Sequence, residues 1–147
     1  NHDKLRESKN VEDVWARTQA ACQIAHEEGA LVKIILETGN LPSSGLVYSA
    51  AKSACEAGAD FVKTSTGFTH PGADHNSFAA MAHAVADHYQ ATGRMVGLKA
   101  SGGISSFEAA DVYIRLAENI AGPQWADPTL MRIGASGLLS GAAPSTY

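Results

Sequence analysis

Two lysines in this 147-residue chain follow apolar segments and precede glycine-containing turns. Lys63 ends the segment FVK before TSTG, and Lys99 ends the segment VGLK before ASGG. If both segments are neighbouring parallel strands, which lie about 4.8 Å apart, the two amines lie close together at similar heights. A second ammonium and burial both disfavour the charged amine, and a free amine can attack a carbonyl to form a Schiff base. The structural alternative is that each lysine only extends its ammonium group from a strand end into water.

Two glycine-rich turns are candidates for phosphate binding. Ser101-Gly102-Gly103 follows the segment with Lys99, and Gly134-Ala135-Ser136-Gly137 follows the last apolar segment. Glycine lets backbone N–H groups approach an anion closely, and a helix N-terminus adds a favourable dipole. Glycine turns are also ordinary connectors, so the pattern alone leaves both interpretations open.

The histidines do not predict a metal site. His70, His75, His83 and His88 lie in a loop and on one predicted helix, without a cysteine or carboxylate at metal-ligand spacing. His83 and His88 are five residues apart and so do not share a helical face. We expect solvated residues, and neither a metal nor another cofactor.

The elements that must position these residues repeat in a fixed order of apolar strand, glycine-containing turn and helix. Strand starts lie about 30 to 36 residues apart, the length of a βα unit with its loops. The predicted strands are 31–36, 60–64, 95–99 and 131–134, and the predicted helices are 11–28, 43–57, 76–92 and 106–121.

Caps and apolar faces delimit these helices. Asn10 is the predicted N-cap of the first helix, Gly29 its C-terminal stop, and Ser106 the N-cap of the last. Trp125 is expected to be a packing anchor before the last strand. The residues predicted to face the core on the first and last helices are Val14, Trp15, Thr18, Cys22 and Ala25, and Phe107, Ala110, Ile114, Ala117 and Ile120.

Alternating strands and helices predict an α/β fold with a parallel sheet. No G-x-G-x-x-G fingerprint follows a strand, which disfavours a dinucleotide-binding sheet. Polar residues such as Glu37, Lys63, Lys99 and Ser136 cluster where strands are predicted to end, as in the loops of a (β/α)8 TIM barrel. A barrel typically needs about 250 residues, so four strands supply half of one and leave open sheet edges.

Composition limits the classes of partner. The net charge is −4, with 45% hydrophobic and 18% charged residues, which argues against a general nucleic-acid binder or a polybasic membrane surface. No apolar run approaches the roughly 20 residues of a membrane span, and no signal peptide is recognised. Cys22 and Cys55 lie among alanines, which predicts buried free thiols in a reducing, cytoplasmic compartment.

Four segments together resemble the deoxyribose-phosphate aldolase family. They are VKIILETGNL, EAGADFVKTSTGF, MVGLKASGGIS followed by FEAA, and MRIGASGLL, and they occur in family order between Leu31 and Leu139. The resemblance implies a (β/α)8 barrel and a class I aldolase that requires no metal. Such an enzyme reversibly cleaves 2-deoxy-D-ribose 5-phosphate to D-glyceraldehyde 3-phosphate and acetaldehyde.

The resemblance also implies roles for individual residues. Lys63 matches the Schiff-base lysine, and Lys99 matches the second lysine, which perturbs the first and takes part in proton transfer. Tyr147 resembles a C-terminal tyrosine that assists proton exchange in some members, although an inert tail is the alternative. The candidate substrate-binding and phosphate-binding residues are Thr66, Gly67, Gly102, Gly103, Gly134 and Ser136.

Three departures from the family pattern bear on activity. The family's catalytic aspartate lies on a strand that would precede the first predicted helix, and this strand is absent from the chain. Ile104-Ser105-Ser106 stands where many members have a basic residue after the glycine pair. Gly137 replaces the second serine of a common GASS turn. The last two changes predict a weaker preference for phosphorylated substrates.

We therefore expect residues 1–147 to form the C-terminal half of a single TIM-barrel domain. Residues 1–29 would be an N-terminal loop and helix, residues 30–139 four βα units, and residues 140–147 a flexible tail. An N-terminal half-barrel segment or chain would complete the barrel, within an oligomer and without nucleic-acid or membrane partners. The alternatives are a non-catalytic half-barrel that self-associates as a scaffold or binding protein, and a Schiff-base aldolase for another aldehyde.

Overall fold

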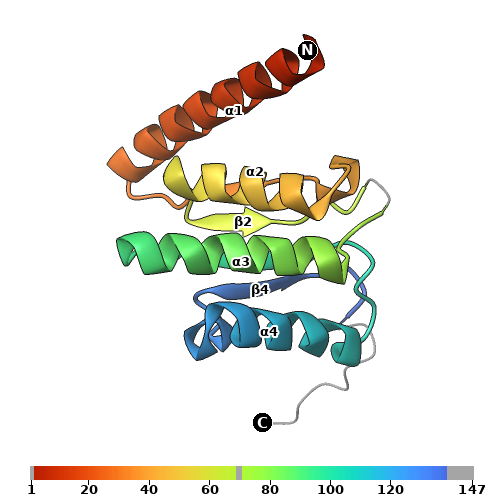
Figure 1. The fold of residues 1–147 in the computed structure, drawn as a ribbon. Helices are drawn as coiled ribbons and strands as arrows, with labels where there is room; N and C mark the ends of the chain where they lie inside the picture. The colour runs from red at the N-terminus through yellow and green to blue at the C-terminus, as the bar shows by residue number, and fades with distance from the viewer. Residues whose placement is uncertain (1, 69–70, 139–147) are drawn as a thin grey trace.

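The computed structural model describes residues 2–68 and 71–138, with side chains from residue 15 onward. Helices and strands alternate along the chain (Figure 1). They are α1 (His2–Glu27), β1 (Lys33–Ile35), the 3₁₀ helix η1 (Thr38–Asn40), α2 (Ser44–Glu56), β2 (Phe61–Lys63), α3 (His75–Thr92), β3 (Gly97–Ser101), α4 (Phe107–Ala121), the 3₁₀ helix η2 (Pro123–Ala126) and β4 (Met131–Gly134).

The four strands form one parallel sheet in the order β1-β2-β3-β4, which confirms the predicted α/β arrangement. Helices α2, α3 and α4 cover one face of this sheet, as Figure 1 shows. Val62 and Leu98 project toward these helices and are fully buried, together with Phe78 and Met81 of α3. The opposite face of the sheet is open, and the side chain of Ile35 on that face is 43% exposed.

Polar caps begin the three helices that cover the sheet. The side chains of Ser43, Asp74 and Ser106 each accept a hydrogen bond from the backbone N–H three residues later. These bonds satisfy donors that an α-helix leaves unpaired in its first turn. The cap predicted at Ser106 is therefore confirmed.

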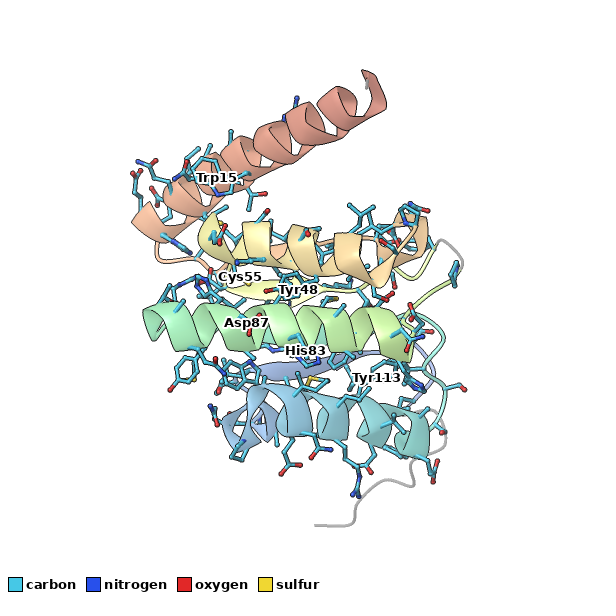
Figure 2. The ribbon with its side chains drawn as sticks, in the orientation of Figure 1. Trp15, Tyr48, Cys55, His83, Asp87 and Tyr113 are labelled. Atoms are coloured by element: carbon cyan, nitrogen blue, oxygen red, sulfur yellow. The ribbon has the colours of Figure 1, made fainter. Side chains whose placement is uncertain are left out.

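Figure 2 shows how α2 and α3 meet through polar side chains at their surface. The Tyr48 hydroxyl on α2 donates a 2.6 Å hydrogen bond to Asp87 Oδ2 on α3. Beneath this pair the two helices pack through small residues, among them Ala51 and Ala84, which are fully buried. Small side chains let the two helix backbones lie close together over the sheet.

Trp125 is the packing anchor that the sequence predicted. It is fully buried, and its Nε1 donates a 2.8 Å hydrogen bond to the Val96 carbonyl. The Tyr89 ring of α3 packs edge-on against it at 5.4 Å between centroids. η2 lies between α4 and β4 in the chain, and its Trp125 attaches it to the residue just before β3.

The predicted N-terminal loop is wrong, because α1 begins at His2 and runs through Asn10. The first ten residues include Lys, Leu, Arg and Glu, which favour helix, and contain no Gly or Pro to interrupt one. Asn10 is therefore not an N-cap. The stop at Gly29 is confirmed, since this residue has φ 70° just beyond the helix end.

Two residues predicted to face the core are exposed. Trp15 is 37% exposed because α1 diverges from α2 toward its N-terminus, so only its last turns are covered, near buried Cys22 (Figure 1). Phe107 is 56% exposed because it is the first residue of α4, beyond the part that packs on α3. Tyr113 takes the core position instead, packing edge-on against Phe78 and donating to the Ala73 carbonyl.

The strands also differ in length from those predicted. β1 is shorter than 31–36, since only Lys33–Ile35 pair with β2. β3 begins later and continues to Ser101, because its pairing with β4 extends to Gly134. Lys99 is therefore in the middle of its strand and not at its end.

Candidate active site

Lys63 and Lys99 are register partners on the neighbouring strands β2 and β3. Each is partly buried and belongs to the open face, because side chains two residues apart on a strand share a face. Lys99 in turn is the register partner of Arg132 on β4. The strand register thus confirms that the two lysines stand at one height on neighbouring strands.

The amine of Lys99 is held in an environment that disfavours its charge. Burial lowers the pKa of Lys99, and the neighbouring cations of Lys63, Lys33 and Arg132 lower it further. A lowered pKa increases the fraction of free amine near neutral pH, which suits a group that accepts and returns protons. Burial and a neighbouring lysine, which the sequence predicted to act on Lys63, thus act on Lys99.

Gly134 makes room for the Lys99 side chain. A Cβ added at Gly134 would lie 2.8 Å from Lys99 Cε and 2.6 Å from Ser101 Oγ. Real Cβ atoms essentially never approach other atoms so closely, and any larger residue would displace Lys99. This glycine, predicted as a phosphate contact, thus has a packing role beside the second lysine.

A cleft of about 620 Å³ opens at the carboxyl ends of β2, β3 and β4. All six residues predicted to bind substrate or phosphate line it, namely Thr66, Gly67, Gly102, Gly103, Gly134 and Ser136. The other lining residues are Phe68, Ser101, Ile104, Ser105, Ala135 and Gly137. None of these twelve side chains is ionisable, so backbone N–H groups and hydroxyls would have to hold an anion here.

Buried hydroxyls fix the two loops that flank the cleft. Thr64 Oγ1 accepts a 3.0 Å hydrogen bond from the Ser101 N–H and donates a 3.1 Å bond to the Ser101 carbonyl. Ser65 Oγ donates to the same carbonyl. Since Thr64 and Ser65 are fully buried, the loop after β3 is held to the loop after β2 by water-excluded bonds. Neither residue was predicted to belong to the site, although both directly follow Lys63.

The close approach of two loop backbones also depends on glycine. A Cβ on Gly102 would meet Ser65 Oγ at 2.9 Å, and a Cβ on Gly72 would meet the Gly102 carbonyl carbon at 2.7 Å. Gly102 further has φ 97°, a conformation that residues with a side chain rarely adopt. The turn predicted to cradle phosphate is therefore also constrained by packing.

Glu37 orients Thr66 at the edge of the cleft. The Glu37 carboxylate accepts hydrogen bonds from the backbone N–H of Thr66 at 3.2 Å and from its hydroxyl at 2.7 Å. Glu37 itself has φ 48°, and it is the only residue other than glycine with a positive φ in the described part of the chain. Such strain persists where the surroundings fix it, and it often marks a functional site.

No metal-binding cluster of three or more His, Cys, Asp or Glu occurs within residues 2–68 and 71–138. His75 and His83 are exposed, as predicted, whereas His88 is 8% exposed and its Nε2 has no hydrogen-bond partner. The prediction of a solvated His88 is wrong because α3 is covered on several sides, and burial lowers the pKa of its imidazole. His70 and Tyr147 lie outside the described residues.

The two cysteines are buried free thiols, as predicted. Burial raises the pKa of Cys55 to about 12, so this thiol stays protonated and is a poor nucleophile. In the described ranges, no helix combines the length and apolar character that crossing a membrane requires.

Comparisons of the sequence and the structure with known proteins agree on one family of aldolases. The sequence profile of the DeoC/LacD family aldolases matches residues 7–143. The chain is 41% identical to the deoxyribose-phosphate aldolase of Agrobacterium fabrum over 87% of its length and 48% of the relative. It is 38% identical to that of Bos taurus over 95% of its length and 42% of the relative. The chain therefore spans somewhat less than half the length of these relatives.

A solved structure shows the same arrangement of elements. The tetrameric deoxyribose phosphate aldolase of Aeropyrum pernix superimposes with a TM-score of 0.59 at 30% identity, covering 83% of this chain and 45% of that one. The four parallel strands, with the helices that connect them, thus correspond to part of a (β/α)8 barrel, which confirms the predicted fold class. With the profile match over most of the chain, these likenesses show that the chain belongs to the DeoC/LacD family of aldolases.

Proposed function

We propose that this chain carries the Schiff-base half of a class I aldolase that cleaves 2-deoxy-D-ribose 5-phosphate to D-glyceraldehyde 3-phosphate and acetaldehyde. The observation that carries the proposal is the register pairing of Lys63 with Lys99 on the open face, next to a cleft at the strand ends. The relatives named deoxyribose-phosphate aldolase support the choice of substrate.

In this proposal Lys63 is the nucleophile. Its free amine adds to the aldehyde carbon of the open-chain sugar, and loss of water from the carbinolamine leaves an iminium ion. The positively charged nitrogen draws electrons as the C2–C3 bond breaks, while the C3 hydroxyl loses its proton. Glyceraldehyde 3-phosphate departs, and the enamine that remains takes a proton on carbon before water releases acetaldehyde.

Lys99 is proposed as a proton carrier beside that nitrogen. Burial and three cationic neighbours lower its pKa, so its amine can accept a proton and return it near neutral pH. Tyr147, in the C-terminal tail, is proposed as a proton shuttle. The aspartate that the family uses would come from outside this chain.

The substrate phosphate is proposed to sit among Thr66, Gly67, Gly102, Gly103, Gly134 and Ser136. The cleft supports this placement, because glycine-rich backbone and hydroxyls converge there. Since none of the twelve described lining residues is a cation, and Ile104 and Gly137 occupy lining positions, we propose a weaker preference for phosphorylated over unphosphorylated sugar than in relatives with a basic residue there.

The rest of the barrel is proposed to come from an N-terminal half-barrel segment or chain. Residues 1–29 would then form the connection into the described half, residues 30–139 its four βα units, and residues 140–147 a tail. The open face supports this arrangement, as do the edges of β1 and β4, which pair with no further strand within residues 2–68 and 71–138. The tetramer of the Aeropyrum pernix relative supports an oligomer, and the buried free thiols support a reducing, cytoplasmic location.

Borohydride trapping tests the proposed function. The full chain, in the assembly in which it is isolated, is treated with acetaldehyde and sodium borohydride, and the alkylated residue is mapped by mass spectrometry. Alkylation confined to Lys63 is expected, with exposed Lys52 as the internal control. No adduct, or equal labelling of Lys52 and Lys63, would contradict the proposal.

A further inference from the structure

Thr66 brings two hydrogen-bond donors to the cleft, its backbone N–H and its hydroxyl, and both are directed to Glu37. The N–H lies 3.3 Å from Glu37 Oε1 and 3.2 Å from Oε2. The hydroxyl donates a 2.7 Å hydrogen bond to Oε2. Because a hydroxyl carries a single hydrogen, the Thr66 oxygen can then only accept a hydrogen bond from a molecule in the cleft.

A phosphate monoester needs donors, since its charged oxygens accept hydrogen bonds. Thr66, engaged in this way, offers it none. A third donor of the same turn is also used within the chain, because the Phe68 N–H makes a weak 3.4 Å bond to Thr66 Oγ1. The turns after β3 and β4 provide the other backbone groups and hydroxyls that line the cleft.

The Glu37 carboxylate is held in this position by the backbone around it. On one side, the Leu36 N–H donates a 2.9 Å hydrogen bond to the Lys63 carbonyl. On the other side, the Thr38 N–H donates a 2.8 Å hydrogen bond to the Thr64 carbonyl. Glu37 lies between these bonds with a φ of 48°, a strained conformation that persists only where the surroundings fix it. The carboxylate is therefore preset against the turn that follows the proposed nucleophile.

We propose that Glu37 is a positioning residue that sets the substrate preference of the cleft by withholding the two Thr66 donors from the substrate phosphate. The phosphate is then bound from the turns after β3 and β4, and Thr66 supplies only its shape and an acceptor oxygen. This inference rests on the proposed aldolase and narrows its phosphate site. It adds a cause of weak phosphate preference on the β2 side of the cleft, separate from Ile104 and Gly137.

The ratio of kcat/KM for 2-deoxyribose 5-phosphate to kcat/KM for 2-deoxyribose tests this role in the full chain, in the assembly in which it is isolated. Glu37→Ala frees both Thr66 donors and should raise the ratio by about tenfold, the usual effect of one hydrogen bond to a charged group. General damage to the turn would lower both kcat/KM values alike. A ratio that stays unchanged or falls would overturn the proposal.

A second substitution shows whether the effect passes through Thr66. Thr66→Val removes the hydroxyl and keeps the shape of the side chain. In the wild-type background it should change the ratio by less than about twofold, because the hydroxyl is already withheld from the phosphate. In the Glu37→Ala background it should remove much of the rise. An equal effect of Thr66→Val in both backgrounds would contradict the proposal.

Further variants separate the hydrogen bonds from charge and from folding. Glu37→Gln keeps a carbonyl oxygen for Thr66 but removes the negative charge, so its ratio should stay close to wild type. A rise equal to that of Glu37→Ala would mean that charge alone acts, against the proposal. Glu28→Ala, at an exposed carboxylate after α1 that does not line the cleft, is the matched control. Glu37→Gly, which tolerates a positive φ, repeats the test if Glu37→Ala does not fold.

Binding of inorganic phosphate tests the inference without turnover. In a titration followed by ³¹P NMR, Glu37→Ala should bind inorganic phosphate about tenfold more tightly than wild type. Equal dissociation constants would overturn the inference even in an active enzyme. Failure of the proposed function is a different result, because a wild-type protein without an acetaldehyde adduct at Lys63 would not be a Schiff-base aldolase, and the titration would still decide the role of Glu37.

Discussion

The two faces of the four-stranded sheet are built from the same strands, yet they differ in chemistry. The helix-covered face consists of aliphatic side chains such as Val62 and Leu98, which are fully buried. The open face carries Lys63, Lys99 and Arg132 in one register row, with glycines where side chains need room. Because side chains alternate along a strand, a single residue step separates core from site. Buried apolar packing is therefore concentrated on one face, and the proposed reactive amines lie on the other.

The largest expected effect is loss of the nucleophile on the open face. Lys63→Met should reduce aldol cleavage by on the order of 10⁴-fold or more, because covalent catalysis is lost entirely. Circular dichroism and the urea midpoint should stay close to wild type, since Lys63 is not part of the helix-covered core. Steady-state kinetics with 2-deoxyribose 5-phosphate makes the measurement, and near-normal activity would exclude Lys63 as the Schiff-base residue.

Removing the second lysine should have a smaller effect on the same reaction. Lys99→Met is expected to lower kcat by about 10²–10⁴-fold, the usual range for a lost proton carrier, while Lys63 still forms some adduct with acetaldehyde. Single-turnover measurements separate adduct formation from turnover. Equal loss of adduct and turnover would mean that Lys99 acts only through the structure around Lys63.

The lowered pKa of Lys99 also predicts a pH dependence with a defined sign. In the folded protein the pKa of Lys99 lies below 10.5, its value in the unfolded chain. At a pH below the folded pKa, the charged Lys99 amine lowers the free energy of unfolding. This penalty disappears as the pH rises from the folded pKa toward the unfolded pKa. Stability of wild type relative to Lys99→Met should therefore increase with pH in this window. Urea midpoints measured between neutral pH and about pH 10 test it, and a constant difference would show that Lys99 is not destabilised in its charged form.

On the helix-covered face the expected effect is on stability. Leu98→Ala removes a fully buried side chain on β3, next in sequence to Lys99, and should reduce the free energy of unfolding by about 2–5 kcal/mol. Under conditions where the variant is folded, kcat should fall far less than in Lys99→Met. If Leu98→Ala were as inactive as Lys99→Met but as stable as wild type, the helix-covered face would not be the one that provides stability.

The smallest expected effect concerns the rim of the cleft. Ser105→Arg, at an exposed residue that lines the cleft, would place a cation beside the glycine pair and should raise kcat/KM for 2-deoxyribose 5-phosphate relative to 2-deoxyribose by about tenfold, which corresponds to roughly 1.4 kcal/mol. Phe107→Arg, at an exposed residue that does not line the cleft, is the matched control. An unchanged ratio of the two kcat/KM values would mean that the phosphate does not sit near Ser105.

The local sequence was sufficient for much of the fold. Apolar segments spaced by one βα unit predicted four parallel strands, and Ser106, Gly29 and Trp125 were placed correctly, because caps, stops and a buried tryptophan depend mostly on nearby residues. The motifs in family order likewise predicted six of the twelve residues that line the cleft.

Only the tertiary structure decided which neighbours surround each side chain. His88 is buried and Phe107 exposed because helix packing, rather than helical periodicity, sets their environment. The hydrogen bonds from Thr64 and Ser65 to Ser101, and the convergence of Lys33 and Arg132 on Phe61, join residues that lie dozens of positions apart. The sequence by itself therefore determined the family, the strands and the lysines, whereas register and packing decided which charges meet, because electrostatic interactions depend on distances that only the folded chain defines.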